Sequence, residues 1–404
     1  KFRWFEGLVP LIHLYARRPE EWMQTLGRRL REQGADYPSL QPMWLRAKNE
    51  WRQETHIVNL CMMLKYEALC CAFFGEARSH QADALWAVLA ENHGTAVGTF
   101  TGDECLSGTA NTQGTELCAI VEQMYSYELL YAYTGDSKWA ERLEVLAFNA
   151  LPATISDDMW VHQYVQMSNQ IACQKFPAKP VFRTNNKEAH LFGLEPNFGC
   201  CTANFNQGWP KLALSAFMKD GNTVISSLPI PSELCTADKH ITLKTDYPFK
   251  NSLCYTIEAK TDFTFVVRIP SFAKKLRVNG EGVDCGELVF EVKAGSRHEI
   301  TVEFEAEAYL ESRPNGLNTV KCGSLVFSLP IKYAAEKIEY ERDGVERRFP
   351  YCDYEYIPLS DWNYAYCGDM LVLEEREVSD VPFSSELPPV VIKTVGKKSI
   401  KLQA

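Results

Sequence analysis

The stretch LEPNFGCCTANFNQGWPKL, residues 194–212, holds the adjacent cysteines Cys200 and Cys201 and lies close to where the chain changes from helical to β-type patterning. The pair stands between a loop rich in Pro, Asn and Gly and a run with helical character. Adjacent thiols can form a strained disulfide, bind a metal ion, or supply a nucleophile with a neighbour. They can also be simply buried, which the pair taken alone favours, because unoxidised cysteine is among the most buried residue types.

Residues 1–219 carry the apolar spacing of helices, joined in pairs by short turns such as TGD at 134–136. No sequence repeat accompanies these pairs, so a toroid of helical hairpins fits better than a solenoid of strict period. Helices are predicted at 4–15, 20–33, 56–74, 82–92, 115–134, 137–150 and 202–217.

After residue 220 the pattern changes to short alternating runs separated by turn residues, which is typical of β-sandwiches. Asn279-Gly280 predicts a type I′ hairpin turn, because both central residues of that turn need positive φ. The domains expected are 1–219, helical; 220–312, a β-sandwich; and 313–404, a second β-rich domain. Strands are predicted at 223–228, 240–244, 253–259, 263–269, 276–278, 288–292, 299–304, 318–329 and 370–374.

Composition and charge exclude several classes of protein. Apolar residues make up 46% and charged residues 23% of the 404, as in globular proteins. The net charge of −10 and the lack of a basic cluster argue against a nucleic-acid partner. No run reaches the roughly 18–20 apolar residues that a membrane helix requires, so a soluble protein with no membrane partner is expected.

The 14 cysteines are irregularly spaced in a long chain, which indicates reduced thiols and a metal site more than a disulfide framework. A reducing environment is therefore favoured. The chain opens without Met or a signal-peptide pattern, so localisation stays open between cytoplasm and periplasm. The oligomeric state also stays open, with a homodimer among the alternatives.

Glu116 and Cys118, in QGTELCAIVE, are the first candidates for chemistry. With Thr115 as N-cap, both would lie in the first helical turn, where the helix dipole favours anionic side chains. Together with Cys200 and Cys201 they would supply one carboxylate and three thiolates, a set that suits zinc. The spacing is not that of a zinc finger, and E-x-C is a weak motif, so separately buried residues remain the alternative.

Asp103 and Glu104, in the loop GDECLSG, are the second candidates. The pair is either a solvated acidic turn or the general acid/base of a glycoside-cleaving site, and either carboxyl could be the acid. His56 opens the apolar run 56–74 and is either a capping or core histidine or a hydrogen-bond partner of a sugar. The second vicinal pair, Cys70-Cys71, lies among apolar residues and indicates packing.

Aromatic residues gather in DWNYAY, residues 361–366. They could form a platform for sugars, but aromatic side chains more often fill cores and seams, so a domain interface is favoured.

Four segments together resemble a known family: GDECLSG, QGTELCAIVE, TGDSKWAERLEVLAFNALPA and PNFGCCTANFNQGWPKL. They are similar to the β-L-arabinofuranosidase-type glycoside hydrolases of family 127, and FVVRIPSFAKKLRVNGE in the β region resembles the family's RIP…VNG segment. The resemblance runs from about residue 51 to about residue 374 with the motifs in order.

The resemblance implies an (α/α)6-barrel-type toroid followed by β-sandwich domains. It also implies a zinc ion held by Glu116, Cys118, Cys200 and Cys201, with Cys200 as nucleophile and Cys201 as ligand only. Glu104 matches the family's acid/base glutamate, although this loop is shorter than in the best-known members. His56 matches a substrate-contacting histidine, and Tyr164 matches a cleft tyrosine less securely.

The implied activity is a retaining hydrolase that releases β-L-arabinofuranose or a related sugar from plant glycans, with an oligosaccharide or glycan as partner. The alternative is a non-catalytic carbohydrate-binding or scaffold protein with a structural zinc site. A barrel of six helical hairpins needs more helices than the sequence predicts before residue 220. The chain is therefore expected to be the C-terminal part of a longer enzyme.

Overall fold

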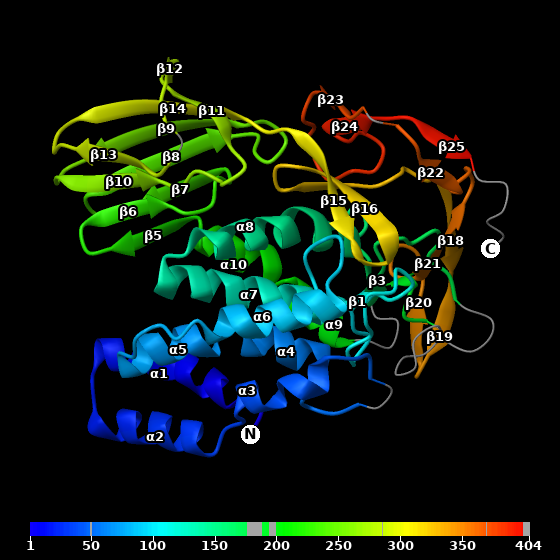
Figure 1. Cartoon of the computed structure of the whole chain (residues 1–404), viewed down its shortest axis with the longest axis horizontal. Helices are drawn as coiled ribbons and strands as arrows, with labels where there is room; N and C mark the ends of the chain where they lie inside the picture. The colour runs from blue at the N-terminus through cyan, green and yellow to red at the C-terminus, as the bar shows by residue number, and fades with distance from the viewer. Residues whose placement is uncertain (49–50, 176–187, 194–198, 285, 369, 399–404) are drawn as a thin grey trace. The chain divides into compact units, whose positions relative to one another are not determined.

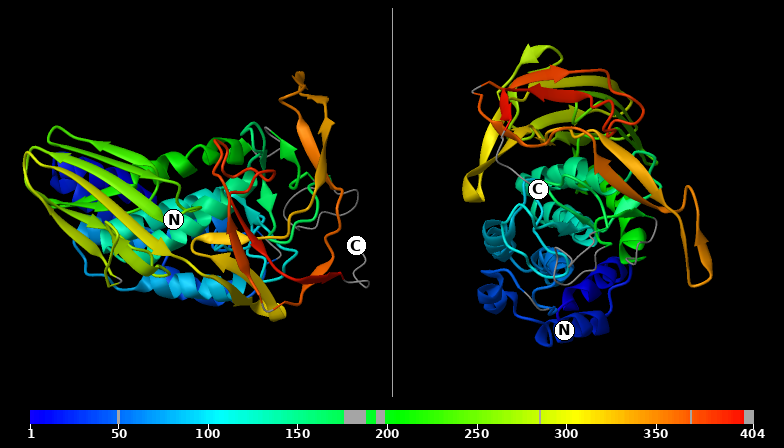
Figure 2. Two further views of the ribbon diagram at one scale, coloured as in Figure 1. Left: turned by 90° about the horizontal axis from the view of Figure 1, so that it is seen from above. Right: turned by 90° about the vertical axis from the view of Figure 1, so that its right-hand side faces the viewer.

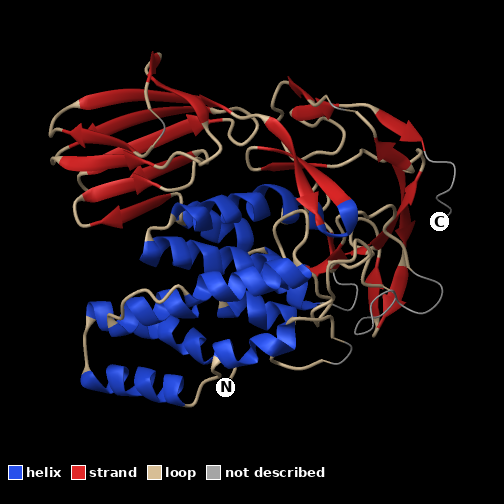
Figure 3. Cartoon of the chain, viewed as in Figure 1, coloured by secondary structure: helices blue, strands red, loops and turns tan. Residues whose placement is uncertain are grey.

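The computed structural model describes residues 1–48, 51–175, 188–193, 199–284, 286–368 and 370–398. The chain forms two compact units, and each combines segments that are separate in the sequence. The first comprises Lys1–Gly208 and Lys332–Leu359, and the second comprises Trp209–Ile331 and Ser360–Ala404. Figure 3 shows helices in the N-terminal part of the chain and strands after them. The predicted order, helices followed by strands, is confirmed, while the predicted domain limits at 219 and 312 stay predictions.

The first unit contains helices that lie side by side in Figure 1, and the right-hand view of Figure 2 looks along them. Their positions agree with most of the ranges predicted from the apolar spacing. The helices of the described chain before residue 215 are α1 (Leu8–Arg17), α2 (Glu21–Glu32), α3 (Tyr37–Leu40), α4 (Ile57–Met63), α5 (Tyr66–Phe74), α6 (Gln81–His93), α7 (Leu117–Thr134), α8 (Ser137–Val145), α9 (Gly199–Phe205) and α10 (Gly208–Leu214).

Helix α7 lies at the centre of this unit and packs against α4, α5, α8 and α9. Its side chains are apolar on nearly every face, as expected for a helix surrounded by others. Ile120, Met124 and Tyr127 are fully buried. Because the helix is held on all sides, its first residues have fixed positions, and this matters for the site described below.

The single helix predicted at 56–74 is wrong in one respect, because the chain turns between α4 and α5 at Leu64 and Lys65. The Lys65 side chain is fully buried, and its ammonium lies 2.7 Å from a Glu6 carboxylate oxygen and 3.4 Å from one of Glu122. An ammonium taken out of water needs such partners, since its desolvation is costly. The uniformly apolar surroundings in the sequence gave no sign of this interruption.

The stretch Ile57–Phe74 also corrects the expectation that no run is long enough to cross a membrane. By length and composition alone these 18 residues pass that test, and they are the one such stretch in the described chain. However, 83% of the stretch is buried inside the protein. Core helices of this kind meet the same criterion, so the stretch is weak support for a membrane span.

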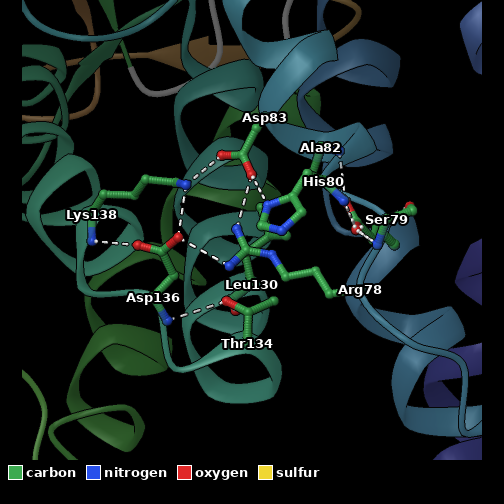
Figure 4. A network of polar contacts seen from close by, with 10 residues as sticks. Arg78, Ser79, His80, Ala82, Asp83, Leu130, Thr134, Asp136 and Lys138 are labelled. Atoms are coloured by element: carbon green, nitrogen blue, oxygen red, sulfur yellow. Dashed lines mark hydrogen bonds and ion pairs between the residues drawn. The ribbon is translucent and has the colours of Figure 1, made fainter.

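A network of charged side chains joins α6, the end of α7 and the start of α8 (Figure 4). Asp136 is the N-cap of α8, and its carboxylate accepts a hydrogen bond from the backbone N–H of Lys138 at 3.3 Å. The same carboxylate lies 3.0 Å from the Arg78 guanidinium and 2.7 Å from the Lys138 ammonium. Asp83 pairs with both cations, at 2.9 and 2.7 Å. The network fixes the turn that connects the two helices.

The second unit contains two larger sheets whose facing side chains touch. One has the strand order β13-β10-β6-β5 and the other β12-β11-β14-β9-β8-β7. Tyr255 on β9 meets Phe265 on β10 edge to face at 5.2 Å, and its hydroxyl lies 2.8 Å from that of Ser226. The strands are β5 (Phe217–Asp220), β6 (Thr223–Ser226), β7 (Ser232–Cys235), β8 (Lys239–Thr245), β9 (Ser252–Ala259), β10 (Phe263–Val267), β11 (Lys274–Val278), β12 (Glu281–Gly282), β13 (Leu288–Val292) and β14 (Arg297–Glu305).

Sequence alternation placed most of these strands correctly. The Asn279-Gly280 turn has φ values of 51° and 84°, which confirms the predicted hairpin between β11 and β12. The single strand predicted at 318–329 is two strands, because the chain turns at Gly323, where φ is 56°. The sheet they belong to consists of β15 (Ala308–Arg313), β16 (Leu317–Cys322) and β17 (Leu325–Phe327).

Several strands join segments that are far apart in the sequence. Within the first unit, a sheet of order β18-β21-β4-β2 brings residues 333–358 beside strands from the 160s and 190s. Its members are β2 (His162–Gln163), β4 (Phe192–Gly193), β18 (Tyr333–Ile338) and β21 (Asp353–Pro358), and the remaining strands of the described chain are β1 (Thr115–Glu116), β3 (Val165–Gln166), β19 (Tyr340–Arg342), β20 (Val345–Arg347), β22 (Tyr364–Tyr366), β23 (Val372–Glu375), β24 (Val390–Lys393) and β25 (Gly396–Lys398).

Candidate active site

The first two site residues lie where a short strand becomes helix α7. Glu116 is the last residue of β1, pairs with Val165 of β3, and immediately precedes the helix. The prediction that Thr115 caps the helix is therefore wrong, and Glu116 lies outside the first turn. The pairing with β3 keeps both residues extended, a long-range contact that no local pattern reveals. Cys118 is in the first turn, as expected.

The second pair of site residues lies at the start of α9, which packs against α7. Cys201 is fully buried, whereas Cys200 is exposed. The Cys201 Sγ lies 3.5 Å from the Cys118 Sγ and 3.9 Å from the Cys200 Sγ. Residues 194–198, part of the loop expected before the pair, lie outside the described residues. The two cysteines thus have different surroundings, and only Cys200 can meet a molecule from solvent.

Glu116, Cys118, Cys200 and Cys201 form one group, in which the potential ligand atoms all lie within 4.8 Å of one another. Within the described chain, Oε2 of Glu116 is buried and has no hydrogen-bond partner. A buried carboxylate oxygen that accepts no hydrogen bond, beside three thiols, is costly unless a cation is present. The group could therefore bind a metal ion, as the sequence predicted.

The three thiols differ in acidity. Hydrogen bonds from Cys118 and Cys201 lower the pKa of Cys200 and outweigh the opposing effect of its partial burial. The hydrogen bond to Cys200 raises the pKa of Cys118, and burial raises that of Cys201. Burial, together with the charges of Glu104 and Cys200, raises the pKa of Glu116. Of the three thiols, the exposed one, Cys200, is thus the one whose pKa the group lowers.

Glu104 faces this group with two polar partners. The Tyr164 hydroxyl donates to its Oε1 at 2.9 Å, and Nε2 of His56 lies 3.1 Å from its Oε2. The same His56 nitrogen lies 3.9 Å from Oε2 of Glu116. Burial raises the pKa of Glu104, but His56 and the Tyr164 hydrogen bond outweigh it and the net pKa is lowered. The Glu104 carboxyl and the His56 imidazole thus form one continuous polar cluster with the group of four potential metal ligands.

The structure separates the two acidic residues of the GDE loop. Asp103 is buried and accepts a hydrogen bond from the Ser107 hydroxyl at 3.4 Å. Glu104 is the one that lies beside His56 and Tyr164, with its side chain 29% exposed. Of the two carboxyls in this loop, that of Glu104 is thus the partly exposed one, and the acid/base role expected for the loop stays a prediction.

The histidine prediction also becomes more definite. His56 occupies the N-cap position of α4, but its side chain makes no capping hydrogen bond. Its ring instead lies between Glu104 and Glu116, so the interpretation as a cap does not hold. Cys70 is buried and Cys71 half-buried on α5, in keeping with packing. In the 361–366 stretch, Tyr364 and Tyr366 are exposed on β22 of the second unit, and the interface role expected for them stays a prediction.

Two features of the site were missed from the sequence. The ring of Trp51, half-exposed, lies 5.8 Å from that of His56, so an apolar indole borders the cluster. Nε2 of His162 on β2 lies 2.8 Å from the Thr202 hydroxyl, next to Cys201 on α9. Trp51 is close to His56 in the sequence and could have been noticed there. The pairing of His162 with Thr202 spans forty positions and has no local signal.

Comparison with known proteins shows which family the sequence around this site resembles. Residues 68–214 match the sequence model described as "Beta-L-arabinofuranosidase, GH127 catalytic domain". None of the curated proteins matches the chain. The matched range contains Glu104, Glu116, Cys118 and both cysteines of the adjacent pair.

Three solved structures share the fold, each aligned over 87% of this chain. One is described as a glycoside hydrolase, with a TM-score of 0.62, 15% identity and 71% of its own chain covered. The second is Ara127N-Se, a GH127 β-L-arabinofuranosidase from Geobacillus stearothermophilus T6, with a TM-score of 0.58, 15% identity and 68% covered. The third is the GH127 β-arabinofuranosidase BT3674, with a TM-score of 0.57, 17% identity and 65% covered. At these identities the likeness concerns the fold.

The motifs, the family match and the fold agree with one another. The expected resemblance is therefore confirmed: residues 68–214 match the sequence model of the family 127 catalytic domain, which supports a glycoside hydrolase, and the chain shares its fold with the three solved structures.

Proposed function

We propose that this protein is a retaining glycoside hydrolase in which the Cys200 thiolate attacks the sugar and Glu104 moves the proton. The observation that carries the proposal is the asymmetry of the cysteine pair. Cys200 is exposed and hydrogen bonds from its neighbours lower the pKa of its thiol, whereas Cys201 is fully buried and burial raises the pKa of its thiol. A thiolate that reaches solvent can act as a nucleophile, and a neighbouring carboxyl group and imidazole can assist it by proton transfer and orientation.

In the first step, the sulfur of Cys200 forms a bond to the anomeric carbon as the bond to the glycosidic oxygen breaks. Glu104 gives its proton to the departing oxygen, which leaves as an alcohol. The product on the enzyme is a thioglycoside of Cys200. His56 and Tyr164 hold the Glu104 carboxyl by contacts of 3.1 and 2.9 Å, so that it is oriented before the substrate arrives.

In the second step, the Glu104 carboxylate takes a proton from a water molecule, and the water oxygen bonds to the anomeric carbon. The carbon–sulfur bond breaks and the Cys200 thiolate is restored. Two displacements at the same carbon give net retention of configuration.

The proposal includes zinc, held by Glu116, Cys118, Cys200 and Cys201. One carboxylate and three thiols within 4.8 Å of one another, with a buried carboxylate oxygen that accepts no hydrogen bond in the described chain, suit this cation. When bound, zinc keeps its cysteine ligands deprotonated at neutral pH. The remaining work is done by side chains of the protein: Cys201 and Cys118 stay buried and keep Cys200 in place.

The substrate we propose is a β-L-arabinofuranoside or a related furanoside of plant glycans. The support is the family match and the names of two solved relatives, which are β-arabinofuranosidases. We also propose the finer architecture that the resemblance implies: the helices form part of an (α/α)6 barrel, and the sheets joined by Tyr255 and Phe265 form a β-sandwich. The long-range contacts of α7 and the two facing sheets support it.

Replacement of the nucleophile tests the function directly. We expect Cys200→Ser to lower the turnover of an aryl β-L-arabinofuranoside by roughly 10⁴-fold or more, because a hydroxyl at neutral pH is a far weaker nucleophile than a thiolate. The matched control is Cys71→Ser, since Cys71 is half-buried on α5 and lies outside the cluster. Initial rates are measured after circular dichroism has shown both variants to be folded.

Equal activity of Cys200→Ser and Cys71→Ser would rule out the assignment of the nucleophile. A wild-type protein that binds arabinosyl oligosaccharides in calorimetry without releasing sugar would instead support the non-catalytic carbohydrate-binding alternative.

A further inference from the structure

The hairpin formed by β7 and β8 carries a second group of potential metal ligands, in the other compact unit. β7 is the edge strand of the six-stranded sheet. In the register of the hairpin, Cys235 lies directly opposite His240, and Glu233 lies opposite Thr242. Residues two apart on a strand share a face, and so do directly opposed residues. Glu233, Cys235 and His240 are therefore on one face.

Distances between these side chains confirm the shared face. Oε1 of Glu233 lies 2.5 Å from Nε2 of His240 and 3.5 Å from Sγ of Cys235. One oxygen, one nitrogen and one sulfur atom thus lie within 4.8 Å of one another. All three residues are exposed, so they can adjust without disturbing a core.

These spacings suit a small, thiophilic divalent cation. Zinc binds sulfur at about 2.3 Å and nitrogen at about 2.1 Å, which places tetrahedral ligand atoms roughly 3.3–3.7 Å apart. The sulfur–oxygen separation of 3.5 Å already falls in that range. The shorter contact between Glu233 and His240 is a hydrogen bond, which a cation would replace as the two exposed side chains separate by under an ångström.

The positively charged side chain nearest in sequence, that of Lys239, is turned away from this face. Lys239 precedes His240, so its side chain points to the opposite side of β8. Its ammonium lies 2.5 Å from an Asp238 carboxylate oxygen and 5.2 Å from the centre of the Phe263 ring. The positive charge closest in sequence is thus engaged elsewhere, and Arg297, on the same face two strands away, is paired with Glu258 at 2.9 Å.

We infer that Glu233, Cys235 and His240 form a second metal site, which binds zinc or a similar thiophilic divalent ion and leaves a fourth position to water. On binding, the S–H bond of Cys235 breaks, its proton passes to solvent, and a metal–sulfur bond forms. His240 contributes a nitrogen lone pair and Glu233 a carboxylate oxygen. The site is distinct from the buried cluster of the first unit, and it does not depend on the proposed hydrolase activity.

A plain surface ion pair is the competing explanation. An exposed His–Glu contact contributes at most about 1 kcal/mol and is common on protein surfaces. It does not need a thiol, whereas here a cysteine directly faces the histidine and lies within 3.5 Å of the same oxygen. The two explanations differ in whether the thiol responds to a metal.

Alkylation of individual cysteines distinguishes them. The full chain is treated with iodoacetamide in the presence and absence of zinc chloride, and modified peptides are quantified by mass spectrometry. We expect zinc to slow alkylation of Cys235 by about tenfold or more, because a metal-bound sulfur is a poorer nucleophile. Cys254, an exposed cysteine on β9, is the internal control and should react equally with and without zinc.

Four variants complete the test. His240→Ala and Glu233→Gln, which keep the thiol and the exposed strands, should lose the protection of Cys235. Metal analysis after dialysis should show one zinc equivalent fewer in Cys235→Ser than in wild type and no change in Cys254→Ser. If zinc leaves the alkylation of Cys235 unchanged, or if His240→Ala keeps full protection, the second site does not exist.

Discussion

At the scale of single residues, Glu104 has the most unusual backbone of the site. Its φ is 115°, a value that few residues other than glycine adopt. Its carbonyl oxygen accepts a hydrogen bond from the Ile57 N–H at 2.8 Å, and Tyr164 and His56 hold its carboxyl group. Strained conformations persist where the surroundings over-determine them, and they are common at functional sites. Both the side chain and the backbone of Glu104 are thus held by neighbouring residues.

Removal of the Tyr164 hydroxyl should change the pH dependence of the reaction. The hydrogen bond from Tyr164 helps to lower the pKa of Glu104, so Tyr164→Phe raises it. If Glu104 gives a proton in the first step, kcat/KM falls as the pH rises through this pKa. The variant should therefore remain active to higher pH than wild type, with the descending limb of the profile displaced upward.

Profiles of kcat/KM against pH for wild type, Tyr164→Phe and Tyr133→Phe provide the measurement. Tyr133 is 40% exposed on α7 and serves as the control, whose profile should match that of wild type. A descending limb that stays in place or moves to lower pH would contradict the role given to Glu104.

The residues of the site could be predicted to different degrees. Cys118 and the adjacent pair at 200–201 were found from residue type and family resemblance, and the structure brings them together with Glu116. The conformation of Glu116 was not foreseen, because it depends on the pairing of β1 with β3. The choice between Asp103 and Glu104 also needed the fold, since adjacent acidic residues look alike in a sequence.

At the scale of elements, the break between α4 and α5 depends on one buried charge. Replacing Lys65 with methionine keeps the length of the side chain but leaves Glu6 and Glu122 without their shared cation. We expect Lys65→Met to lower the free energy of unfolding by about 3–5 kcal/mol, as for other buried ion pairs that lose one partner. Urea denaturation followed by far-ultraviolet circular dichroism measures the change.

A second variant separates charge from packing in this experiment. The triple variant Lys65→Met, Glu6→Gln, Glu122→Gln removes both carboxylates and should recover much of the loss. Arg18→Ala breaks an exposed pair with Glu20 and should cost under about 1 kcal/mol. If Lys65→Met is no more damaging than Arg18→Ala, the buried pairs do not stabilise the break.

The cap of α8 predicts a dependence of stability on pH. Burial raises the pKa of Asp136, but hydrogen bonds from Lys138 and Arg78 outweigh it, and the net pKa lies below 3.8. The ionised carboxylate therefore stabilises the fold at pH values above about 3.8, and this contribution is lost as the pH falls through the lowered pKa. Asp136→Ala should cost about 1–2 kcal/mol at neutral pH.

Asp136→Asn is the informative comparison, because an amide oxygen can still cap the helix but carries no charge. It should lie between wild type and Asp136→Ala at pH 7. The difference between wild type and Asp136→Asn should shrink as the pH is lowered below the ordinary carboxyl range. A difference that is constant from pH 7 to pH 3 would show that the ion pairs of Asp136 contribute nothing.

Elements could be predicted where the chain itself repeats a pattern. The strand β9 alternates between buried and exposed positions over eight residues, and β13 was placed to the residue. The strands β1, β2, β3 and β4 have two residues each, too few for any periodicity. They exist because their partners lie beside them, so they were invisible before the fold was known.

At the scale of the whole molecule, loss of metal from the cysteine cluster should affect the part of the first unit that holds the cluster, apart from any change at the hairpin of β7 and β8. All four proposed zinc ligands belong to the first unit. Bound metal stabilises the folded state by about 2.7 kcal/mol when its free concentration is a hundred times its dissociation constant. A chelator should therefore increase hydrogen exchange in peptides that contain the starts of α7 and α9, and leave those from β9 and β14 unchanged.

Hydrogen exchange with mass spectrometry on the full chain, with and without chelator, gives this comparison peptide by peptide. Readdition of zinc should restore the original exchange. Equal exchange of the α7 and α9 peptides in both conditions would count against a metal bound by the cysteine cluster.

The order of the two kinds of secondary structure, helices and then strands, could be predicted from the sequence. The return of residues 332–359 to the first unit could not. Tyr333–Ile338 carries no clear alternation, because its residues are mostly exposed, and β21 pairs with Phe192 far away in the sequence. A strand pattern predicts that a partner exists, but it does not say which partner.

The distance along the chain between the cysteines has a consequence for the topology of folding. Cys118 and Cys201 are 83 positions apart, so a cation that binds both closes a large loop, as a disulfide would. A cross-link that closes a loop of this length removes conformational entropy from the unfolded chain. By the argument used for disulfides, this loss raises the free energy of unfolding by about 4–5 kcal/mol. The short strands β2, β3 and β4 all lie inside this loop. With the proposed cation bound, the cluster would therefore act as a cross-link that a chelator can remove.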